Sequence, residues 1–238
     1  MVNKDFVAII PAAGKSERFL GETPKQFIKL DGRSILELSL IPLLDFSECL
    51  GICVVVPLGD QYHKSLKVLG SPKISVIEGS DSRTSSVKLG LDFWKNSQMS
   101  FDFVLIHDAV RPCLRSSDIK ELLSSLSEDV DGVVLGMPST DTIKEVVDAS
   151  NEISTTLERT KIWKAFTPQI FKKDLLNKSF LNIKKNTKYT DEASVVEAND
   201  GVLRMVQGSN DNIKLTFSED IPLIKSILSS QGRGEDSS

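Results

Sequence analysis

The chain has 238 residues, of which 40% are hydrophobic, and a formal net charge of −4 at pH 7. That length is enough to bury a full core in one large domain. The negative charge argues against nucleic acid as a partner, because a duplex needs a clustered basic face and these cations lie in separate loops. No apolar run approaches the ~20 residues of a membrane span, and the first residues do not look like a signal or transit peptide. We therefore expect a cytoplasmic protein that does not bind membranes.

The three cysteines, Cys49, Cys53 and Cys113, lie in or beside apolar runs. An odd number of cysteines without a secretory signal predicts reduced residues that pack in the core. A zinc site is not expected, because the cysteines form no CxxC pair and His63 and His107 stand alone.

The first predicted element is a strand, because residues 6–10 form the continuous apolar run typical of a parallel sheet buried on both faces. The loop that follows combines small residues with cations, namely Ala12, Ala13, Gly14, Lys15, Arg18 and Lys25. Small residues let the backbone approach a ligand, and backbone N–H groups together with cations can bind phosphate oxygens. The pattern indicates a polyphosphate site, although a surface turn with solvated lysines has a similar composition.

Two common phosphate-binding motifs do not fit this loop. The P-loop spacing would place a glycine at Ile9, and the dinucleotide fingerprint would place one at Ser16.

Strands and helices then alternate along the chain. Strands are predicted at 52–56, 74–77, 103–106, 133–135, 203–206 and 213–217, and helices at 34–44, 82–94, 119–126, 173–181, 191–198 and 220–228. This alternation predicts an α/β fold with a single, mostly parallel sheet covered on both sides. Ligands of such sheets bind at the carboxyl ends of the strands.

Residues 142–147 and 153–157 interrupt the alternation, because they are polar, β-prone segments on either side of a turn. They predict a projecting β-arm at about 138–163, which needs a partner subunit to cover it, so we expect a homodimer. One domain is expected over 1–230, arm included, followed by a disordered tail at 231–238.

The strand at 103–106 leads directly into His107, Asp108 and Arg111. A carboxylate and a guanidinium at this edge favour a ligand site, and the alternative is an Asp108–Arg111 ion pair that only caps the sheet. His107 is expected to be a packed residue, and without an activated serine or cysteine the pair forms no hydrolase triad.

Three further features allow both a functional and a structural interpretation. Residues 79–86 suit backbone readout of a nucleobase, or helix capping by Asp81 or Ser82. Residues 190–194 fit the capping arrangement of a helix N-terminus. Lys214 alternates with apolar neighbours, so its side chain should point to the opposite face, towards solvent or a ligand.

Six motifs in order resemble the 2-C-methyl-D-erythritol 4-phosphate cytidylyltransferase family of isoprenoid precursor synthesis (the non-mevalonate pathway). They are PAAGKSERF with TPKQF at 11–27, HDAVRP at 107–112, DTIK at 141–144, TPQIF at 167–171, TDEASVVE at 190–197 and NIKLT at 212–216. The resemblance implies a Rossmann-like, glycosyltransferase-A-like nucleotidyltransferase fold. It also implies transfer of CMP from CTP to the polyol phosphate, with release of pyrophosphate.

The resemblance also implies roles for individual residues. Catalytic cations would be Arg18, Lys25 and Lys214; nucleotide-binding residues would be Ala12, Ala13, Gly14, Lys15, Gly79, Asp81, Ser86 and Ala109; substrate-binding residues would be Asp108, Arg111, Thr142, Arg159, Thr167 and Thr190. Mg²⁺ would be held mainly by the phosphates, with Asp108 as a weak protein ligand. Arg159 would reach into the site of the neighbouring subunit of the homodimer.

The chain departs from the family pattern at Ser16 and Ser80, where glycine is common, and at Val110, where alanine is common. Ribitol 5-phosphate cytidylyltransferases typically read LAGG where this chain reads PAAG, which favours the methylerythritol substrate. The alternatives are a cytidylyltransferase for another polyol phosphate, such as ribitol 5-phosphate, and a non-catalytic nucleotide-binding regulatory protein.

Overall fold

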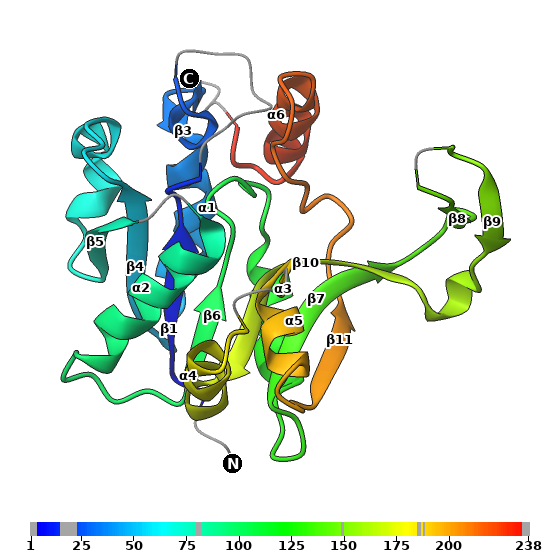
Figure 1. The fold of residues 1–238 in the computed structure, drawn as a ribbon. Helices are drawn as coiled ribbons and strands as arrows, with labels where there is room; N and C mark the ends of the chain where they lie inside the picture. Colours follow the sequence, from blue (N-terminus) through cyan, green and yellow to red (C-terminus); the bar gives the residue numbers. More distant parts are fainter. Residues whose placement is uncertain are drawn as a thin grey trace.

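The computed structural model describes residues 4–14, 23–79, 82–148, 150–184, 187 and 189–234. Its centre is a seven-stranded sheet in the order β11-β7-β10-β6-β1-β4-β5, with helices on both faces (Figure 1). The strands of this sheet are β1 (Phe6–Pro11), β4 (Cys49–Pro57), β5 (Ile74–Gly79), β6 (Phe103–Ile106), β7 (Gly132–Pro138), β10 (Trp163–Lys172) and β11 (Leu203–Gln207).

All neighbouring strands of the sheet pair in parallel except β10, which runs antiparallel to both β6 and β7. The predicted α/β fold with a mostly parallel sheet is confirmed. Because β1, β4, β5 and β6 run in the same direction, their carboxyl ends meet at one edge of the sheet.

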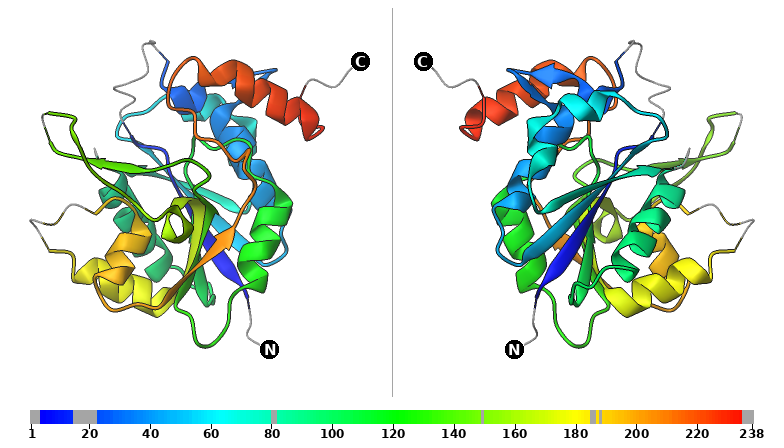
Figure 2. Two further views of the ribbon diagram at one scale, coloured as in Figure 1. Left: turned by 90° about the vertical axis from the view of Figure 1, so that its right-hand side faces the viewer. Right: turned by 90° about the vertical axis from the view of Figure 1, so that its left-hand side faces the viewer.

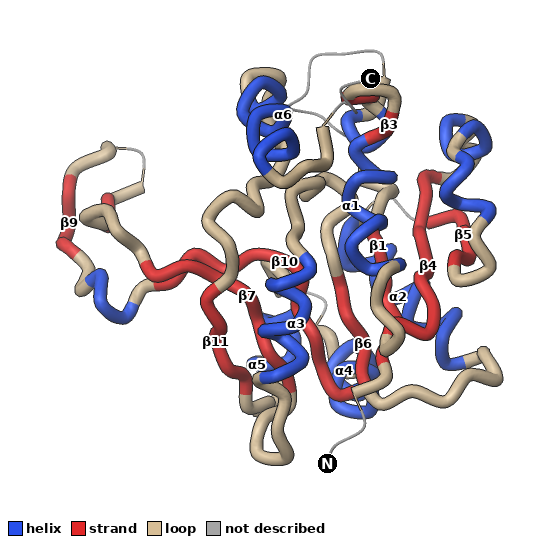
Figure 3. The backbone as a smooth tube through the Cα atoms, turned by 180° about the vertical axis from the view of Figure 1, so that it is seen from behind, coloured by secondary structure: helices blue, strands red, loops and turns tan. Residues whose placement is uncertain are grey.

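The helices are α1 (Ile35–Leu44), α2 (Arg83–Lys95), α3 (Ser116–Ser124), α4 (Lys173–Leu181), α5 (Glu192–Glu197) and α6 (Asp220–Ser230). Short 3-10 turns, η1 to η4, lie at Lys25–Phe27, Tyr62–Ser65, Lys67–Gly70 and Arg159–Lys161, and β2 (Lys29–Leu30) pairs with β3 (Arg33–Ser34). Helices α1 and α3 pack on one face of the sheet and α2, α4 and α5 on the other, while α6 covers a separate small cluster (Figures 2 and 3).

Strand β1 supplies both faces of the core, as its continuous apolar run predicts. Phe6, Ala8 and Ile10 pack on the α1 side, and Val7 and Ile9 pack on the α2 side, all fully buried. The strand therefore fixes the first residues after it, Ala12 to Gly14, at the sheet edge.

The cysteines are buried and free, and burial raises the pKa of each thiol to about 12. They are packing residues, as the sequence predicts.

The structure departs from the predicted strands at two places. Strand β10 was not expected, because Pro168 and several polar residues hide its pattern, yet it pairs on both sides; a register shift between Phe166 and Gln169 accommodates the proline. Residues 213–217 form no strand, because this segment lies outside the sheet and Leu215 packs under α6 instead.

The arm leaves the body after β7 and returns through β10 (Figures 1 and 2). It carries β8 (Lys144–Val146) paired with β9 (Ile153–Thr156), and every residue of both strands is exposed in the single chain. Apolar side chains are among them, since Ile153 is 63% exposed.

The first residues of the tail expected to be disordered, 231–234, are ordered in the structure. Residues 231–234 are described, and Arg233 donates to the carbonyl of Leu114, so this part packs against the body; residues 235–238 lie outside the described residues. None of the helices in the described ranges combines the length and apolar character needed to cross a membrane.

Candidate active site

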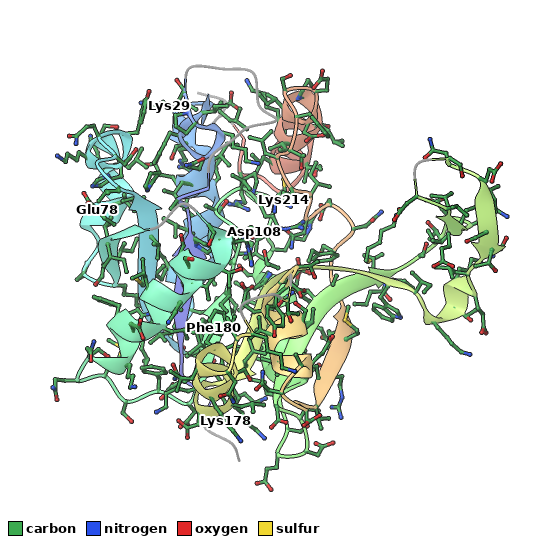
Figure 4. All side chains as sticks on the ribbon, viewed as in Figure 1. Lys29, Glu78, Asp108, Lys178, Phe180 and Lys214 are labelled. Atoms are coloured by element: carbon green, nitrogen blue, oxygen red, sulfur yellow. The ribbon has the colours of Figure 1, made fainter. Side chains whose placement is uncertain are left out.

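A cavity of about 120 Å³ opens at the carboxyl ends of β1 and β6. Residues from four distant parts of the chain line it, namely Pro11, Ala12, Gly14, Lys25, Gln26, Arg83, Asp108, Ala109, Val110 and Lys214. Six of the predicted site residues therefore share one cavity, namely Ala12, Gly14, Lys25, Asp108, Ala109 and Lys214. Figure 4 shows Asp108 and Lys214 close together at this edge.

The residue that directly follows β1, Ala12, is held in place by a buried side chain. Gln26, only 2% exposed, donates from Nε2 to the carbonyl of Ala12 at 2.8 Å, and the Ala12 N–H donates to the carbonyl of Val55. These bonds fix the small residues at the cavity wall and bring Lys25, the neighbour of Gln26, to the same wall.

Asp108 is the centre of the charged groups in the cavity. Its Oδ1 lies 3.0 Å from Arg83 Nε, and its Oδ2 lies 3.0 Å from Lys214 Nζ and 3.4 Å from Arg111 Nε. Burial alone would raise the pKa of Asp108, but the charges of Arg83, Lys214 and Arg111 outweigh it and hold that pKa well below its usual range. Asp108 is therefore a carboxylate at every physiological pH.

Arg111 belongs to this cluster and also contacts the segment that precedes Lys214. It donates to the carbonyl of Asn212 at 2.8 Å, and its guanidinium lies over the ring of Phe166 at 5.5 Å. The Asp108–Arg111 ion pair suggested as a structural alternative is thus present, but it is one part of a larger cluster of cations.

His107 is fully buried, and burial lowers its pKa to about 4, so the ring is neutral. The Asp108 N–H donates to Thr167 Oγ1 at 2.9 Å, Oγ1 lies 3.2 Å from His107 Nδ1, and His107 Nε2 lies 3.2 Å from the carbonyl of Arg111. Because a carbonyl only accepts, Nε2 carries the proton and Nδ1 accepts from the Thr167 hydroxyl. His107 is a packed residue, as predicted, and this chain of bonds orients the backbone of Asp108.

Three residues predicted to bind the nucleotide meet beside β5. A Cβ atom added to Gly79 would lie 3.2 Å from both Ala13 Cβ and Ser86 Oγ, and 2.4 Å from Val55 Cγ1. Glycine is required here by close packing, because a side chain would overlap Val55. Ser82 caps α2 by accepting from the Ser85 N–H at 3.0 Å, so the capping interpretation also applies.

The remaining predicted residues do not line this cavity within one chain. Thr142 and Arg159 lie on the exposed arm, where Arg159 donates to the carbonyl of Thr140, and Thr190 is exposed beside α5. Asp191 caps α5 in a capping box with Ser194, as the sequence allows. Lys15, Arg18 and Asp81 lie outside the described residues.

The family model for 2-C-methyl-D-erythritol 4-phosphate cytidylyltransferase matches residues 6–230. This chain belongs to that family. The predicted membership of this family is confirmed, and with it the predicted nucleotidyltransferase fold and enzyme class.

Relatives of the family match along almost the whole chain. The Alteromonas mediterranea protein of that name is 39% identical, and the match covers 98% of each chain. The solved Francisella tularensis structure of the same name is 30% identical with a TM-score of 0.77, covering 94% of this chain and 100% of that one. The 4-diphosphocytidyl-2C-methyl-D-erythritol synthase structure from Anaerococcus prevotii is 27% identical with a TM-score of 0.81, covering 96% and 100%.

Sequence reasoning missed two charged residues that join the family's motifs in space. Arg83 lies in the hydroxyl-rich segment after β5, and Glu192 lies in the capping segment of α5; Arg83 Nη1 donates to Glu192 Oε1. The sequence analysis considered the segment of Arg83 for nucleobase readout or helix capping, and the segment of Glu192 for helix capping. Their pairing spans 109 positions, and no local pattern encodes such a contact.

Proposed function

We propose that this chain transfers CMP from CTP to 2-C-methyl-D-erythritol 4-phosphate, giving 4-diphosphocytidyl-2-C-methyl-D-erythritol and pyrophosphate. The observation that carries the proposal is the convergence of Lys25 and Lys214 on one cavity with the small residues of the loop after β1. Membership of the family supports the identity of both substrates.

In this reaction a phosphomonoester oxygen of the polyol phosphate attacks the α-phosphorus of CTP, and pyrophosphate leaves. No side-chain nucleophile is needed, because the attacking oxygen belongs to the substrate. Two polyanions repel each other, so the protein must position them and supply positive charge where charge develops on the α-phosphoryl oxygens. We assign that charge to Arg18, Lys25 and Lys214.

The cytidine nucleotide would lie along the loop after β1 and the start of α2. We assign its binding to Ala12, Ala13, Gly14, Lys15, Gly79, Asp81, Ser86 and Ala109. The support is that Ala12, Gly14 and Ala109 line the cavity and that Gly79, Ala13 and Ser86 are neighbours.

We assign the polyol phosphate to Asp108, Arg111, Thr142, Arg159, Thr167 and Thr190. Asp108, an ionised acceptor, suits the hydroxyl groups of a polyol, and Arg111 suits its phosphate. The Thr167 hydroxyl is engaged with Asp108 and His107, so its part in binding is to orient Asp108.

The family reaction implies Mg²⁺, and the cavity suits an ion held mainly by phosphates. Asp108 is the single carboxylate among the lining residues described, and no group of three or more His, Cys, Asp or Glu side chains in the described ranges is placed to bind a metal. When bound, the ion neutralises phosphate charge and helps to orient the triphosphate. Asp108 would be its weak protein ligand.

We further propose a homodimer in which the arm of one subunit completes the site of the other. Support comes from the exposed apolar residues of the arm and from the position of Arg159 and Thr142 on it, away from the cavity of their own chain. A cytoplasmic location stays a prediction from the sequence.

Pyrophosphate release from CTP tests the activity, with 2-C-methyl-D-erythritol 4-phosphate and ribitol 5-phosphate as parallel acceptors. We expect turnover with the first acceptor and a much lower kcat/KM with the second. Preference for ribitol 5-phosphate would reassign the substrate, and no turnover with either acceptor would favour the non-catalytic alternative.

A further inference from the structure

Glu192 is a buried acid that the proposed chemistry does not use. It is 1% exposed, although it lies at the first turn of the short helix α5, where an acidic side chain could equally face solvent. Its Oε1 accepts from Arg83, while its Oε2 is buried without a hydrogen-bond partner among the described residues. Burial raises the pKa of Glu192 above its usual value, and the charge of Arg83, the partner of its Oε1, opposes that rise.

Arg83 connects this buried acid to the active-site cavity. Its Nη1 donates to Glu192 and its Nε donates to Asp108 at 3.0 Å, so two carboxylates hold one planar guanidinium from different sides. Arg83 also lines the cavity. A lysine could not reproduce this arrangement, because its single ammonium lacks the fixed fork of donors.

The two oxygens of Asp108 have different partners. Oδ1 is bound by Arg83, whereas Oδ2 faces Lys214 and Arg111. Fixing Oδ1 therefore determines where Oδ2 lies and how it holds the Lys214 ammonium at the cavity. The two hydrogen bonds of the Arg83 guanidinium, to Glu192 and to Asp108, thus connect α5, α2 and the end of β6.

We propose that Glu192 is a positioning residue, which acts through Arg83 to orient the Asp108 carboxylate towards the polyol phosphate. This inference deepens the proposed function and rests on it. Glu192 itself lies outside the cavity lining and does not touch the substrate. Its effect should appear in KM for the polyol phosphate, which Asp108 contacts, and in kcat through the contact between Asp108 and Lys214, while KM for CTP changes least.

The test measures KM separately for the two substrates in Glu192→Gln, with Glu197→Gln as the matched control. Glutamine keeps the shape and the acceptor oxygen facing Arg83 but removes the charge, and Glu197 is an exposed acid on the same helix. We expect KM for 2-C-methyl-D-erythritol 4-phosphate to rise ~10-fold in Glu192→Gln, as is typical of losing a partner behind a contact residue. KM for CTP should change little, and Glu197→Gln should match the wild type.

A double-mutant cycle with Arg83→Lys tests whether Glu192 acts through Arg83. We expect Glu192→Gln to add no further loss in the Arg83→Lys background, because the link is already broken. Losses that multiply in the double variant, or equal KM values in Glu192→Gln and Glu197→Gln, would overturn the proposal. If Glu192→Gln is unfolded at the assay temperature, Arg83→Lys alone decides: an unchanged KM for the polyol phosphate overturns the proposal.

The same assay separates this inference from the proposed function. A wild-type protein without turnover refutes the proposed function. An active wild type whose Glu192→Gln variant behaves like Glu197→Gln refutes the positioning role alone.

Discussion

Replacing Lys214 by alanine should abolish most of the activity while leaving the fold intact. Its ammonium lies 3.0 Å from Asp108 Oδ2 at the cavity, and in the proposed reaction it meets charge that develops on the α-phosphoryl group. Losing one such donor costs about 2.7–4 kcal/mol of transition-state stabilisation, so kcat should fall ~10²–10³-fold. Initial rates of pyrophosphate release at saturating CTP and polyol phosphate measure this directly.

The stability cost of the same change should be small. The Lys214 side chain is 39% exposed, and Asp108 keeps Arg83 at 3.0 Å and Arg111 at 3.4 Å when it is removed. We expect less than about 1 kcal/mol from urea denaturation, as for other partly exposed ion pairs.

Lys225→Ala is the matched control, because Lys225 also pairs with an acid at 3.1 Å, Asp31, and is 47% exposed, but does not line the cavity. It should retain full activity. A fall in kcat of tenfold or less in Lys214→Ala, or an equal fall in Lys225→Ala, would refute the assigned role.

Three further outcomes are expected. Lys25→Ala and Arg18→Ala should each lower kcat at least ~10²-fold with little loss of stability, because the sequence predicts both outside the helices and strands of the core; steady-state rates and thermal melting check this. Arg159→Ala should mainly raise KM for the polyol phosphate, and mixing it with Lys25→Ala should restore activity in heterodimers; no recovery would count against a shared site. Burial lowers the pKa of His107 from 6.5 to about 4, so the unfolded chain binds the proton more readily than the folded one. The contribution of neutral His107 to the free energy of unfolding is therefore fully present above pH 6.5. It should decline by roughly 3 kcal/mol as the pH falls to about 4. Urea midpoints across that range should drop less in His107→Gln, and parallel pH profiles would contradict the assignment.

Local patterns predicted the elements whose signals are contained in a short stretch of chain. The apolar run of β1 and the loop after it were recognised because burial on both faces and a cluster of small residues with cations are visible within twenty residues or so. Strand β6 and helix α4 have the predicted bounds, since their periodicity is uninterrupted.

Features set by tertiary contacts were not visible in the sequence. Strand β10 lies in the middle of the sheet despite Pro168, because pairing with β6 and β7 outweighs its weak local pattern. The expected side-chain direction of Lys214 agrees with its contact to Asp108, although the strand expected there does not exist. The contacts of Arg83 with Asp108 and Glu192 join positions 25 and 109 residues apart, which only the fold brings together.

The most direct test of the central claim is pyrophosphate release from CTP and 2-C-methyl-D-erythritol 4-phosphate by the wild type and by the Lys25→Ala/Lys214→Ala double variant. If the cations at the sheet edge neutralise the transition state, the wild type turns over and the folded double variant loses at least ~10²-fold in kcat. A folded double variant that turns over at the wild-type rate would contradict the account.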